Sequence, residues 1–533
     1  MLDQSSKRLL SRRCLLFTLA VAVTTTMYQF RVVTFRVDTT SAADALDSAK
    51  STSQPVAIVP GELPGYTGWV RPTYTSAPFY QVSYSKAATA QINELWKFAI
   101  SCQHTTCRDQ NPKFYVRAYG PSVISAIVEP PSKKSRSSEH SVSLMIRDPG
   151  VYWVEVVLEF SNAPPLASYP NSDETPGYEG YLLPGTPFQL MAVDDEVSTN
   201  KQMAPCTVEE MTVHDMNEGY YKSRWVVTDK VNVNKDIAKR NISYSSQEKM
   251  SFHGYVRNIN SIGIFMDLKP TTCELVKDAT SPCFRDLHFI FIGDSVMMGK
   301  HTALLERIQG GANITISFIP VYYRGGGGLG VALPAIKKAL NLVKISNPEK
   351  TCIFFNSGAH EIFGCSQIHK EEWKKLGFPT NRTFSCSSLY KTRFQRLVEI
   401  VDAHPAKIKV FASTHALWPR WGNWGFSWPL NDNEQTQRQR LPLTSHMAAH
   451  FNNIAFSEIS SKFKSIHIVD EYWLTLARPD DREKNGGPTS VLGHLVHPGF
   501  EVYDVMLRQL LTIVLAVNVK SSSCQPSSAE KSI

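Results

Sequence analysis

Residues 287–296 read Leu-His-Phe-Ile-Phe-Ile-Gly-Asp-Ser-Val, a continuous apolar run that ends in a short polar turn. A strand without polar alternation is typical of a parallel sheet with both faces buried. A helical pattern then begins at residue 296. Similar apolar runs and helical stretches continue toward the C-terminus, with runs at 314–321, 352–356, 408–413 and 466–469 and helices at 334–343 and 394–403. This alternation predicts an α/β domain over residues 271–520, with three layers and a parallel sheet in the middle.

Residues 85–200 have a different pattern. Short strand-like runs, the longest at residues 151–160, are separated by turns rich in Pro, Ser and Gly, which predicts a β-sandwich. Asp148-Pro-Gly-Val-Tyr152 stands just before the longest run. It is either the tyrosine corner of an immunoglobulin-like domain or an ordinary hairpin turn. Residues 201–270 are expected to connect the sandwich to the α/β domain.

The N-terminus carries a membrane signal. Residues 1–13 are basic, and residues 14–30 contain no charge. This predicts a type II signal anchor with residues 1–13 in the cytosol and everything after about Arg31 in the lumen of the Golgi apparatus or endoplasmic reticulum. The A-x-A sequence at residues 20–22 leaves open a cleaved signal peptide and a secreted protein. Residues 31–84, rich in Thr, Ser, Ala and Pro, are expected to form a stalk or linker.

Composition limits the class of protein. The 533 residues are 42% hydrophobic with 29 Gly and 10 Cys, which excludes a disordered chain, a collagen and a small disulfide-rich protein. The 56 basic residues exceed the 48 acidic ones only slightly and are spread along the chain, so nucleic-acid binding is not expected. Local spacing suggests the disulfide pairs Cys102 with Cys107, Cys273 with Cys283, and Cys365 with Cys386. Cys102, His104 and Cys107 are also spaced as zinc ligands, but no fourth ligand is evident.

Ser295 is the candidate nucleophile. It follows the first buried strand and opens a helix, at the sheet edge where α/β proteins bind ligands. Its backbone N–H lies near the positive end of that helix and can help to hold an oxyanion. The alternative is that Ser295 is a helix N-cap, a position that favours Asp and Ser, and has no other role.

A nucleophilic serine needs a base and donors for the oxyanion. His497, in a loop before a final helix, is the candidate base. Asn356 ends another buried strand at the same edge, so its side-chain amide is a candidate donor. The backbone N–H groups of Gly325 and Gly326 are further candidates, because glycine allows close approach. Their glycine run lacks the G-K-[ST] ending of a phosphate loop.

These blocks together resemble a known family. Ser295 in Gly-Asp-Ser, Asn356 in Phe-Phe-Asn-Ser-Gly-Ala-His360, and His497 in Val-His-Pro are similar to the blocks of SGNH hydrolases, specifically the PC-esterase branch. That branch includes trichome-birefringence-like polysaccharide O-acetyltransferases and neurexophilin and PC-esterase domain proteins. The resemblance covers roughly residues 110–520 and includes a segment with Cys206, Gly219 and Trp225. It implies an SGNH-like fold, an immunoglobulin-like region ahead of it, and acyl chemistry at the serine.

The segment after residue 412 resembles the His- and Trp-rich loop of the same branch. The candidate substrate-binding residues are His360, His415, Trp418, Arg420, Trp421 and Trp424. The tryptophan rings stand among Pro and Gly, where they could stack on sugar faces, and the arginine could meet a carboxylated sugar. The alternative is a hydrophobic cluster that pins a long loop.

One position departs from the family, whose catalytic histidine usually follows an acid by three residues. Here that position is His494. Because the acid orients the imidazole and stabilises its charged form, another group would have to replace it. A backbone carbonyl could hold the ring in a Ser–His dyad, or the domain could lack activity. The nearby acids are Asp480, Asp481, Glu483, Glu501 and Asp504.

The sequence and the resemblance predict a secretory-pathway O-acyltransferase that moves an acyl group, expected to be acetyl, to a glycan hydroxyl through an acyl-serine. The expected partners are a glycan or glycoconjugate and the membrane. No bound cofactor or metal is expected, and the acyl donor, acetyl-CoA or another acetyl donor, would be a cosubstrate. The alternatives are a glycan O-acetylesterase, a different serine hydrolase such as a lipase, and a catalytically inactive adhesion or ligand-binding protein.

Overall fold

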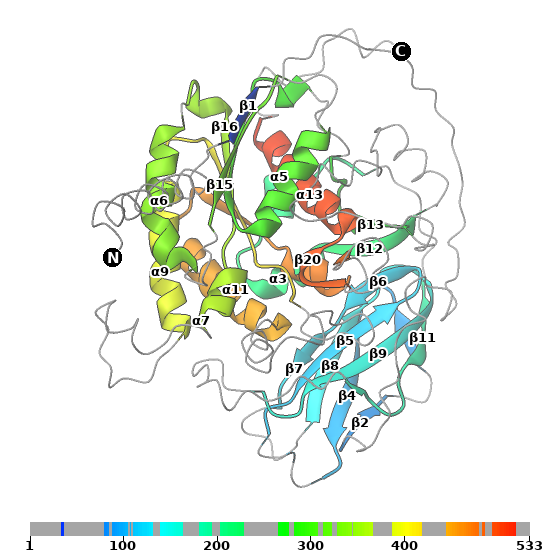
Figure 1. Cartoon of the computed structure of the whole chain (residues 1–533). Coiled ribbons are helices and arrows are strands. Elements are labelled where there is room, and N and C mark those ends of the chain that lie inside the picture. Colours follow the sequence, from blue (N-terminus) through cyan, green and yellow to red (C-terminus); the bar gives the residue numbers. More distant parts are fainter. Residues whose placement is uncertain are drawn as a thin grey trace, which may run out of the picture.

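The computed structural model shows a strand-rich N-terminal region beside a mixed α/β region (Figure 1). The described residues are 33–36, 79–84, 88–104, 107, 110–131, 139–163, 181–194, 203–228, 265–276, 282–307, 313–321, 328–343, 345–365, 386–417, 444–478, 482–484 and 493–518.

The α/β region is built on a six-stranded sheet in the order β1-β15-β14-β16-β17-β18. Its strands are β1 (Val33–Arg36), β14 (His288–Gly293), β15 (Thr315–Pro320), β16 (Thr351–Phe355), β17 (Ile408–Ala412) and β18 (Ile466–Val469). All are parallel except β1, which pairs antiparallel with β15. Numbered along the chain, the parallel strands have the order 2-1-3-4-5. The winding therefore reverses at β14, and ligands bind at such a switch point, beyond the carboxyl ends of β14 and β16.

Helices lie on both faces of this sheet because the side chains of β14 alternate between two cores. Ile290 and Ile292 pack into a core with α6 (Gly328–Leu342), α9 (Cys386–Asp402) and α11 (Ser445–Lys462). Phe289 and Phe291 pack into the other core with α5 (Ser295–Arg307) and α13 (Phe500–Asn518). Figure 1 shows these two groups of helices on opposite sides of the strands. Every residue of β14 is buried, so the prediction of a parallel sheet in an α/β region is confirmed.

The N-terminal region consists of two packed sheets. The larger has the order β13-β12-β6-β5-β9-β11-β3, with β10 beside β9, and the smaller has the order β2-β4-β8-β7. Their strands are β2 (Tyr80–Ser83), β3 (Thr89–Gln91), β4 (Leu95–Cys102), β5 (Lys113–Tyr119), β6 (Ser122–Ser125), β7 (Ile127–Glu129), β8 (Glu139–Met145), β9 (Gly150–Phe160), β10 (Tyr181–Leu182), β11 (Phe188–Val193), β12 (Ser223–Thr228) and β13 (Phe265–Pro270). Apolar side chains from both sheets share one core. The predicted strand-rich region is confirmed.

The turn before β9 has the hydrogen bond of a tyrosine corner. The hydroxyl of Tyr152 donates to the carbonyl of Asp148 at 2.9 Å and lies 2.8 Å from the hydroxyl of Ser122. Gly150, with φ +136°, adopts the left-handed backbone that glycine favours in a turn. A tyrosine whose hydroxyl reaches back to the backbone a few residues upstream defines this corner. The turn therefore has the hydrogen bond that a tyrosine corner makes.

The observed elements differ from the predicted boundaries in the stalk and in the connecting segment. β1 and β2 fall in the predicted stalk, yet β1 joins the α/β sheet and β2 joins the smaller sheet of the sandwich. β12 and β13 fall in the predicted connecting segment but extend the larger sheet. The remaining short elements are α2 (Val208–Met211), α3 (Met216–Lys222), η2 (Pro282–Phe284), η3 (Pro348–Lys350), α7 (Ala359–Cys365), α12 (Tyr472–Leu476), β19 (Arg482–Lys484) and β20 (Gly493–Pro498).

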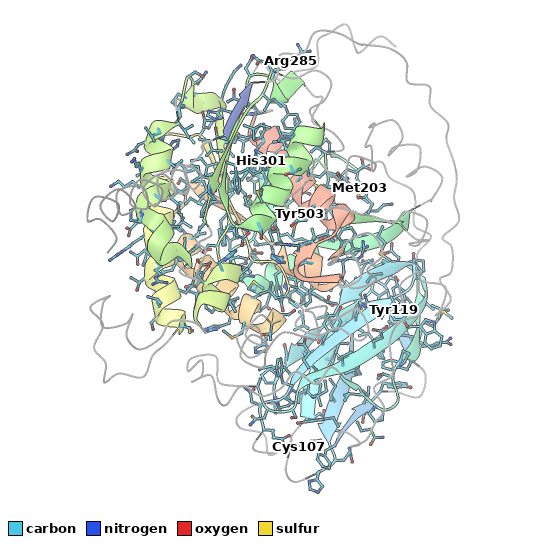
Figure 2. All side chains as sticks on the ribbon, viewed as in Figure 1. Cys107, Tyr119, Met203, Arg285, His301 and Tyr503 are labelled. Atoms are coloured by element: carbon cyan, nitrogen blue, oxygen red, sulfur yellow. A yellow bond between two sulfur atoms is a disulfide. The ribbon has the colours of Figure 1, made fainter. Side chains whose placement is uncertain are left out.

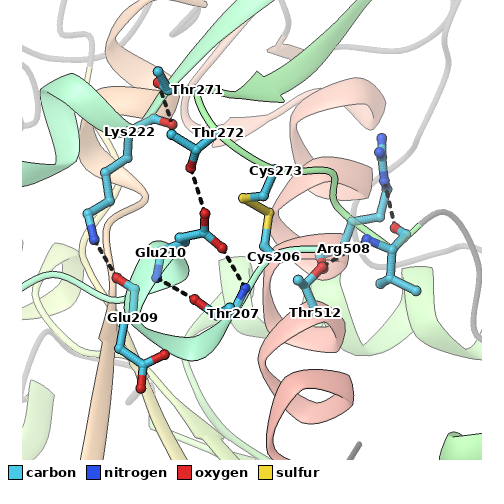
Figure 3. Close-up of a disulfide and its surroundings, with 11 residues drawn as sticks. Cys206, Thr207, Glu209, Glu210, Lys222, Thr271, Thr272, Cys273, Arg508 and Thr512 are labelled. Carbon is cyan, nitrogen blue, oxygen red and sulfur yellow. Dashed lines mark hydrogen bonds between the residues drawn. A yellow bond between two sulfur atoms is a disulfide. The ribbon is translucent and has the colours of Figure 1, made fainter. Parts of the chain in front are cut away.

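Disulfides join Cys102 to Cys107 and Cys206 to Cys273, the second drawn in Figure 3. The first confirms the local pair and leaves neither thiolate for zinc. The second shows that the expected pairing of Cys273 with Cys283 is wrong. A backbone contact explains the pairing of Cys206 with Cys273, because the Cys206 N–H donates to the carbonyl of Glu274 at 3.1 Å and holds the two segments side by side. Cys386 is also disulfide-bonded.

The two regions meet at α12, which follows the carboxyl end of β18. The indole N–H of Trp225 in β12 donates to the carbonyl of Leu474 at 2.8 Å, and the Tyr115 hydroxyl in β5 donates to the carbonyl of Leu476 at 2.7 Å. The last carbonyls of a helix have no partner within it. The sandwich thus satisfies carbonyls of α12 and is fastened to the sheet edge that carries the switch point.

The predicted anchor, residues 14–30, and the cytosolic tail lie outside the described residues. In the part of the chain that the structure describes, no helix combines the length and the apolarity needed to cross a membrane.

Candidate active site

Ser295 is the first residue of α5, separated from the end of β14 only by Asp294, at the switch point of the sheet. Asp294 caps this helix, because its Oδ1 accepts from the backbone N–H groups of Val296 at 2.9 Å and Met297 at 3.4 Å. The alternative in which Ser295 serves only as the N-cap is therefore wrong. The half-buried Ser295 side chain makes a different contact.

The hydroxyl of Ser295 lies 2.6 Å from Nε2 of His497, although the two residues are 202 positions apart. His497 is in β20, just before α13, and is 7% exposed. At this separation a proton can pass directly between the hydroxyl and the imidazole. The predicted nucleophile and the predicted base are thus brought together.

Close packing of α5 against α13 makes this contact possible. A Cβ atom on Gly299 of α5 would lie 2.5 Å from ring carbons of Tyr503 in α13, and Figure 2 labels this tyrosine beside α5. Because glycine lacks a Cβ, the two helices can approach this closely. α5 begins at Ser295 and α13 begins shortly after His497, so this close packing brings the two segments near each other.

Asn356 follows β16 and faces Asp294 across the switch point. Its Nδ2 donates to Asp294 Oδ1 at 3.0 Å, and its Oδ1 accepts from the Asp294 N–H at 3.2 Å. Gly293 lacks a side chain where a Cβ would collide with Asn356 Oδ1. Asn356 therefore fixes the residue next to Ser295, and the second N–H of its amide is the one that could reach an oxyanion.

Asp294 is a buried carboxylate that stays charged. Burial by itself would raise its pKa, but the nearby His360, the Asn356 hydrogen bond and His415 together hold the pKa of Asp294 below its ordinary value. His360 lies half-buried at the start of α7, and His415 is 1% exposed after β17. Both histidines that were predicted to bind substrate thus lower the pKa of the carboxyl group next to Ser295, and His415 does so although it is buried.

Sequence reasoning missed a buried ion pair between Glu471 and α5, the helix that begins at Ser295. Lys300 Nζ of α5 lies 2.6 Å from both carboxylate oxygens of Glu471, and neither side chain is exposed. Burial raises the pKa of Glu471, Lys300 lowers it, and Asp294 raises it, which places Glu471 within electrostatic reach of Asp294. The available signal was Asp470-Glu471 directly after an apolar run, at the same sheet edge as Ser295 and Asn356.

Several predicted residues lie outside the described ranges. They are Gly325 and Gly326 of the glycine run, the acids Asp480 and Asp481, and Trp418, Arg420, Trp421 and Trp424 of the tryptophan-rich loop. His494, at the position of the family's acid, lies in β20. Within the described ranges, no three His, Cys, Asp or Glu residues are grouped so that they could hold a metal ion.

Neither the family models nor the curated proteins contain a match to this chain. Among solved structures, the chain is similar to the crystal structure of the Lin-41 filamin domain, with a TM-score of 0.16 and 10% identity over 22% of this chain and 95% of that one. A TM-score this low carries no argument about fold or function. The fold and the site together define an α/β protein with a Ser–His pair at the switch point of a parallel sheet.

Proposed function

We propose that this chain is a serine-dependent O-acyltransferase that moves an acyl group, expected to be acetyl, to a glycan hydroxyl. The observation that carries the proposal is the 2.6 Å separation between Ser295 Oγ and His497 Nε2 at the carboxyl edge of a parallel sheet. A serine needs an adjacent base to become a nucleophile, and it needs donors that stabilise the oxyanion.

In the first half-reaction, Ser295 Oγ attacks the donor's carbonyl carbon while His497 Nε2 takes the hydroxyl proton. The bond to the leaving group then breaks, the leaving group takes the proton from His497, and an acyl-serine remains. In the second half-reaction, the glycan hydroxyl gives its proton to His497 and attacks the acyl carbon, and Ser295 leaves with that proton. The proposed oxyanion donors are the Ser295 N–H, the second N–H of Asn356, and the backbone of Gly325 and Gly326.

The order of these residues along the fold supports the resemblance to the PC-esterase branch of SGNH hydrolases. Ser295 follows the first parallel strand in chain order, Asn356 the third, and His497 precedes the last helix. The tyrosine corner supports an immunoglobulin-like assignment for the sandwich.

The acid that the family places three residues before the histidine has two candidate substitutes. The β19–β20 ladder pairs Arg482 with Pro498, the residue after His497. Asp481 and Glu483 are the sequence neighbours of Arg482, so they are the first acids to replace in a search for the group that orients the imidazole.

A lumenal site and a glycan acceptor complete the proposal. Disulfides are typical of the secretory pathway, and with the uncharged residues 14–30 they support a type II protein of the Golgi or endoplasmic reticulum membrane. The tryptophan-rich loop supports sugar recognition, with acetyl-CoA or another acetyl donor as cosubstrate. Water in place of the glycan hydroxyl would resolve the same acyl-serine as an O-acetylesterase.

Labelling by a fluorophosphonate tests the nucleophile in the full-length protein. Attack by Ser295 forms an oxygen–phosphorus bond, releases fluoride and passes the serine proton to His497. Ser295→Ala should abolish labelling and transfer of radiolabelled acetyl to glycoprotein glycans, and His497→Gln should slow both by about 10³-fold or more. Ser457→Ala, at an exposed serine of α11, is the matched control and should react as the wild type does.

The products separate the remaining alternatives. Radiolabelled acetyl on glycans identifies a transferase, and free acetate with Ser295 dependence identifies an esterase. A wild-type chain that never reacts would leave an adhesion or ligand-binding protein, whereas a Ser295→Ala chain that reacts as the wild type does would place the reaction at another residue and overturn the proposal.

A further inference from the structure

Glu361 joins the segment after β16 to the first turn of α6. It is 7% exposed and lies in the first turn of α7. Its Oε2 accepts from the N–H of Gly358 at 2.8 Å and from the hydroxyl of Ser357 at 3.1 Å. Its Oε1 accepts from the N–H of Leu329, 32 positions earlier in the chain, at 2.8 Å. One buried carboxylate therefore contacts the N-terminal turns of two helices.

The chemistry of helix ends explains why a carboxylate occupies this place. The first N–H groups of a helix have no partner within it and carry partial positive charge, so an anion there is stabilised. Hydrogen bonds to a charged acceptor are also stronger than neutral ones. The two oxygens of the Glu361 carboxylate thus link the N-terminal turns of α6 and α7 through hydrogen bonds.

Both linked segments lead directly to proposed oxyanion donors. Ser357, bonded to Oε2, is the residue after Asn356. Leu329, bonded to Oε1, follows the glycine run that contains Gly325 and Gly326. The link therefore constrains the spacing between the Asn356 amide and the first turn of α6.

Further hydrogen bonds hold the Asn356 side of this link. The carbonyl of Ser357 accepts from the Thr414 hydroxyl at 2.9 Å and from the Tyr390 hydroxyl at 3.2 Å. Gly358, at φ +148°, lies against Thr414 where a Cβ would collide. These contacts anchor the loop to β17 and α9, whereas the Glu361 carboxylate reaches across to α6.

We propose that Glu361 is a positioning residue that holds the Asn356 segment at a fixed spacing from the first turn of α6, so that the Asn356 amide stays where an oxyanion requires it. This inference rests on the proposed acyl transfer at Ser295. Losing one oxyanion donor lowers kcat by about 10²–10³-fold, and displacing donors costs less, so Glu361→Gln should lower kcat by about ten- to a hundredfold with KM unchanged.

The test compares Glu361→Gln with Glu458→Gln in the full-length protein, using the fluorophosphonate as probe. Glu458 of α11 is also buried and pairs with Lys462 and Lys391, so its variant matches the chemical change at a different place. The labelling rate constant reports positioning of the phosphonate oxygen, and the endpoint reports the folded fraction. Glu361→Gln should lower the rate constant about ten- to a hundredfold at an unchanged endpoint, and Glu458→Gln should leave the rate constant within about twofold.

Hydrogen exchange provides a readout that does not depend on chemistry at Ser295. An amide side chain has one acceptor oxygen where the carboxylate has two, so Glu361→Gln should speed exchange at the amide of either Leu329 or Gly358. Three results for Glu361→Gln would overturn the positioning role while the acyl transfer proposal stands. They are a labelling rate constant equal to that of the wild type, a labelling endpoint that falls while the rate constant stays the same, and unchanged hydrogen exchange at both amides. A wild-type chain that never labels would remove both proposals.

Discussion

Asp470 is a buried carboxyl group whose two oxygens have different surroundings. Oδ1 accepts from the N–H of Tyr472 at 2.8 Å and from the hydroxyl of Ser413 at 3.1 Å. Oδ2 is buried without a hydrogen-bond partner among the described residues, and Asp470 lines a cavity of about 20 Å³ together with Gly219 and Gln509. Burial raises the pKa of Asp470 to about 7, partly opposed by the hydrogen bonds to Oδ1. Below that pH the folded protein therefore holds a proton on this group.

The proton on Asp470 should make stability depend on pH. The pKa of Asp470 in the folded protein lies above the ordinary value of 3.8, so protonation of Asp470 stabilises the folded protein. This stabilisation is fully present below about pH 4 and is lost as the pH rises through about 7. Asp470→Asn mimics the neutral form, so its free energy of unfolding should exceed that of wild type by about 1–3 kcal/mol at about pH 8 and approach it at about pH 4. Urea unfolding of both proteins across this range measures the difference. A difference that does not change with pH would mean that Asp470 does not titrate in this window.

At the scale of elements, the Lys300–Glu471 pair links α5, the helix that begins at Ser295, to α12. Neither side chain is exposed, so each charge depends on the other for compensation. Removing one partner of a buried pair leaves an uncompensated charge, whereas replacing both by apolar groups costs little. Lys300→Met should lower the free energy of unfolding by about 3–5 kcal/mol, and Lys300→Met with Glu471→Met should recover much of this loss. Denaturant midpoints at neutral pH, measured for the wild type and both variants, test this prediction. A double variant with a midpoint as low as that of Lys300→Met would contradict the argument.

The elements that carry the candidate site could be predicted because their apolar runs are unambiguous. β14 is apolar on both faces, and Ser295 and Asn356 each end such a run, so their meeting at one edge follows from parallel pairing. Glu361 and Lys300 were missed because an acid in a first helical turn and a lysine inside a helix are usually solvated. Only the neighbours that cover them make them buried, and those neighbours are distant in sequence. The Cys206–Cys273 pairing was missed for the same reason, since spacing along the chain does not contain the backbone contact that creates it.

At the scale of the whole molecule, the sandwich and the α/β sheet are held at the edge that carries Ser295. Trp225 is 1% exposed, its N–H donates to the carbonyl of Leu474, and the guanidinium of Arg478 lies 4.6 Å from the centre of its ring. The Trp473 N–H donates to the carbonyl of Met216 at 2.5 Å, so α12 is also tied to α3. The two regions should therefore unfold together.

Trp225→Phe tests this coupling because it removes one donor and keeps an aromatic ring. The Leu474 carbonyl would lose its partner in a buried place, which together with the smaller ring should lower the free energy of unfolding by about 2–4 kcal/mol. Trp96→Phe is the matched control, since Trp96 is half-buried in β4 and packs against Phe98 within the sandwich. We would follow urea unfolding by intrinsic fluorescence and by fluorophosphonate labelling. In the wild type both signals should change in one shared transition, whereas in Trp225→Phe unfolding should begin at a lower urea concentration and the two signals should change in separate transitions. If Trp225→Phe and Trp96→Phe lower the midpoint equally and the two signals stay coincident, the junction at α12 does not couple the regions.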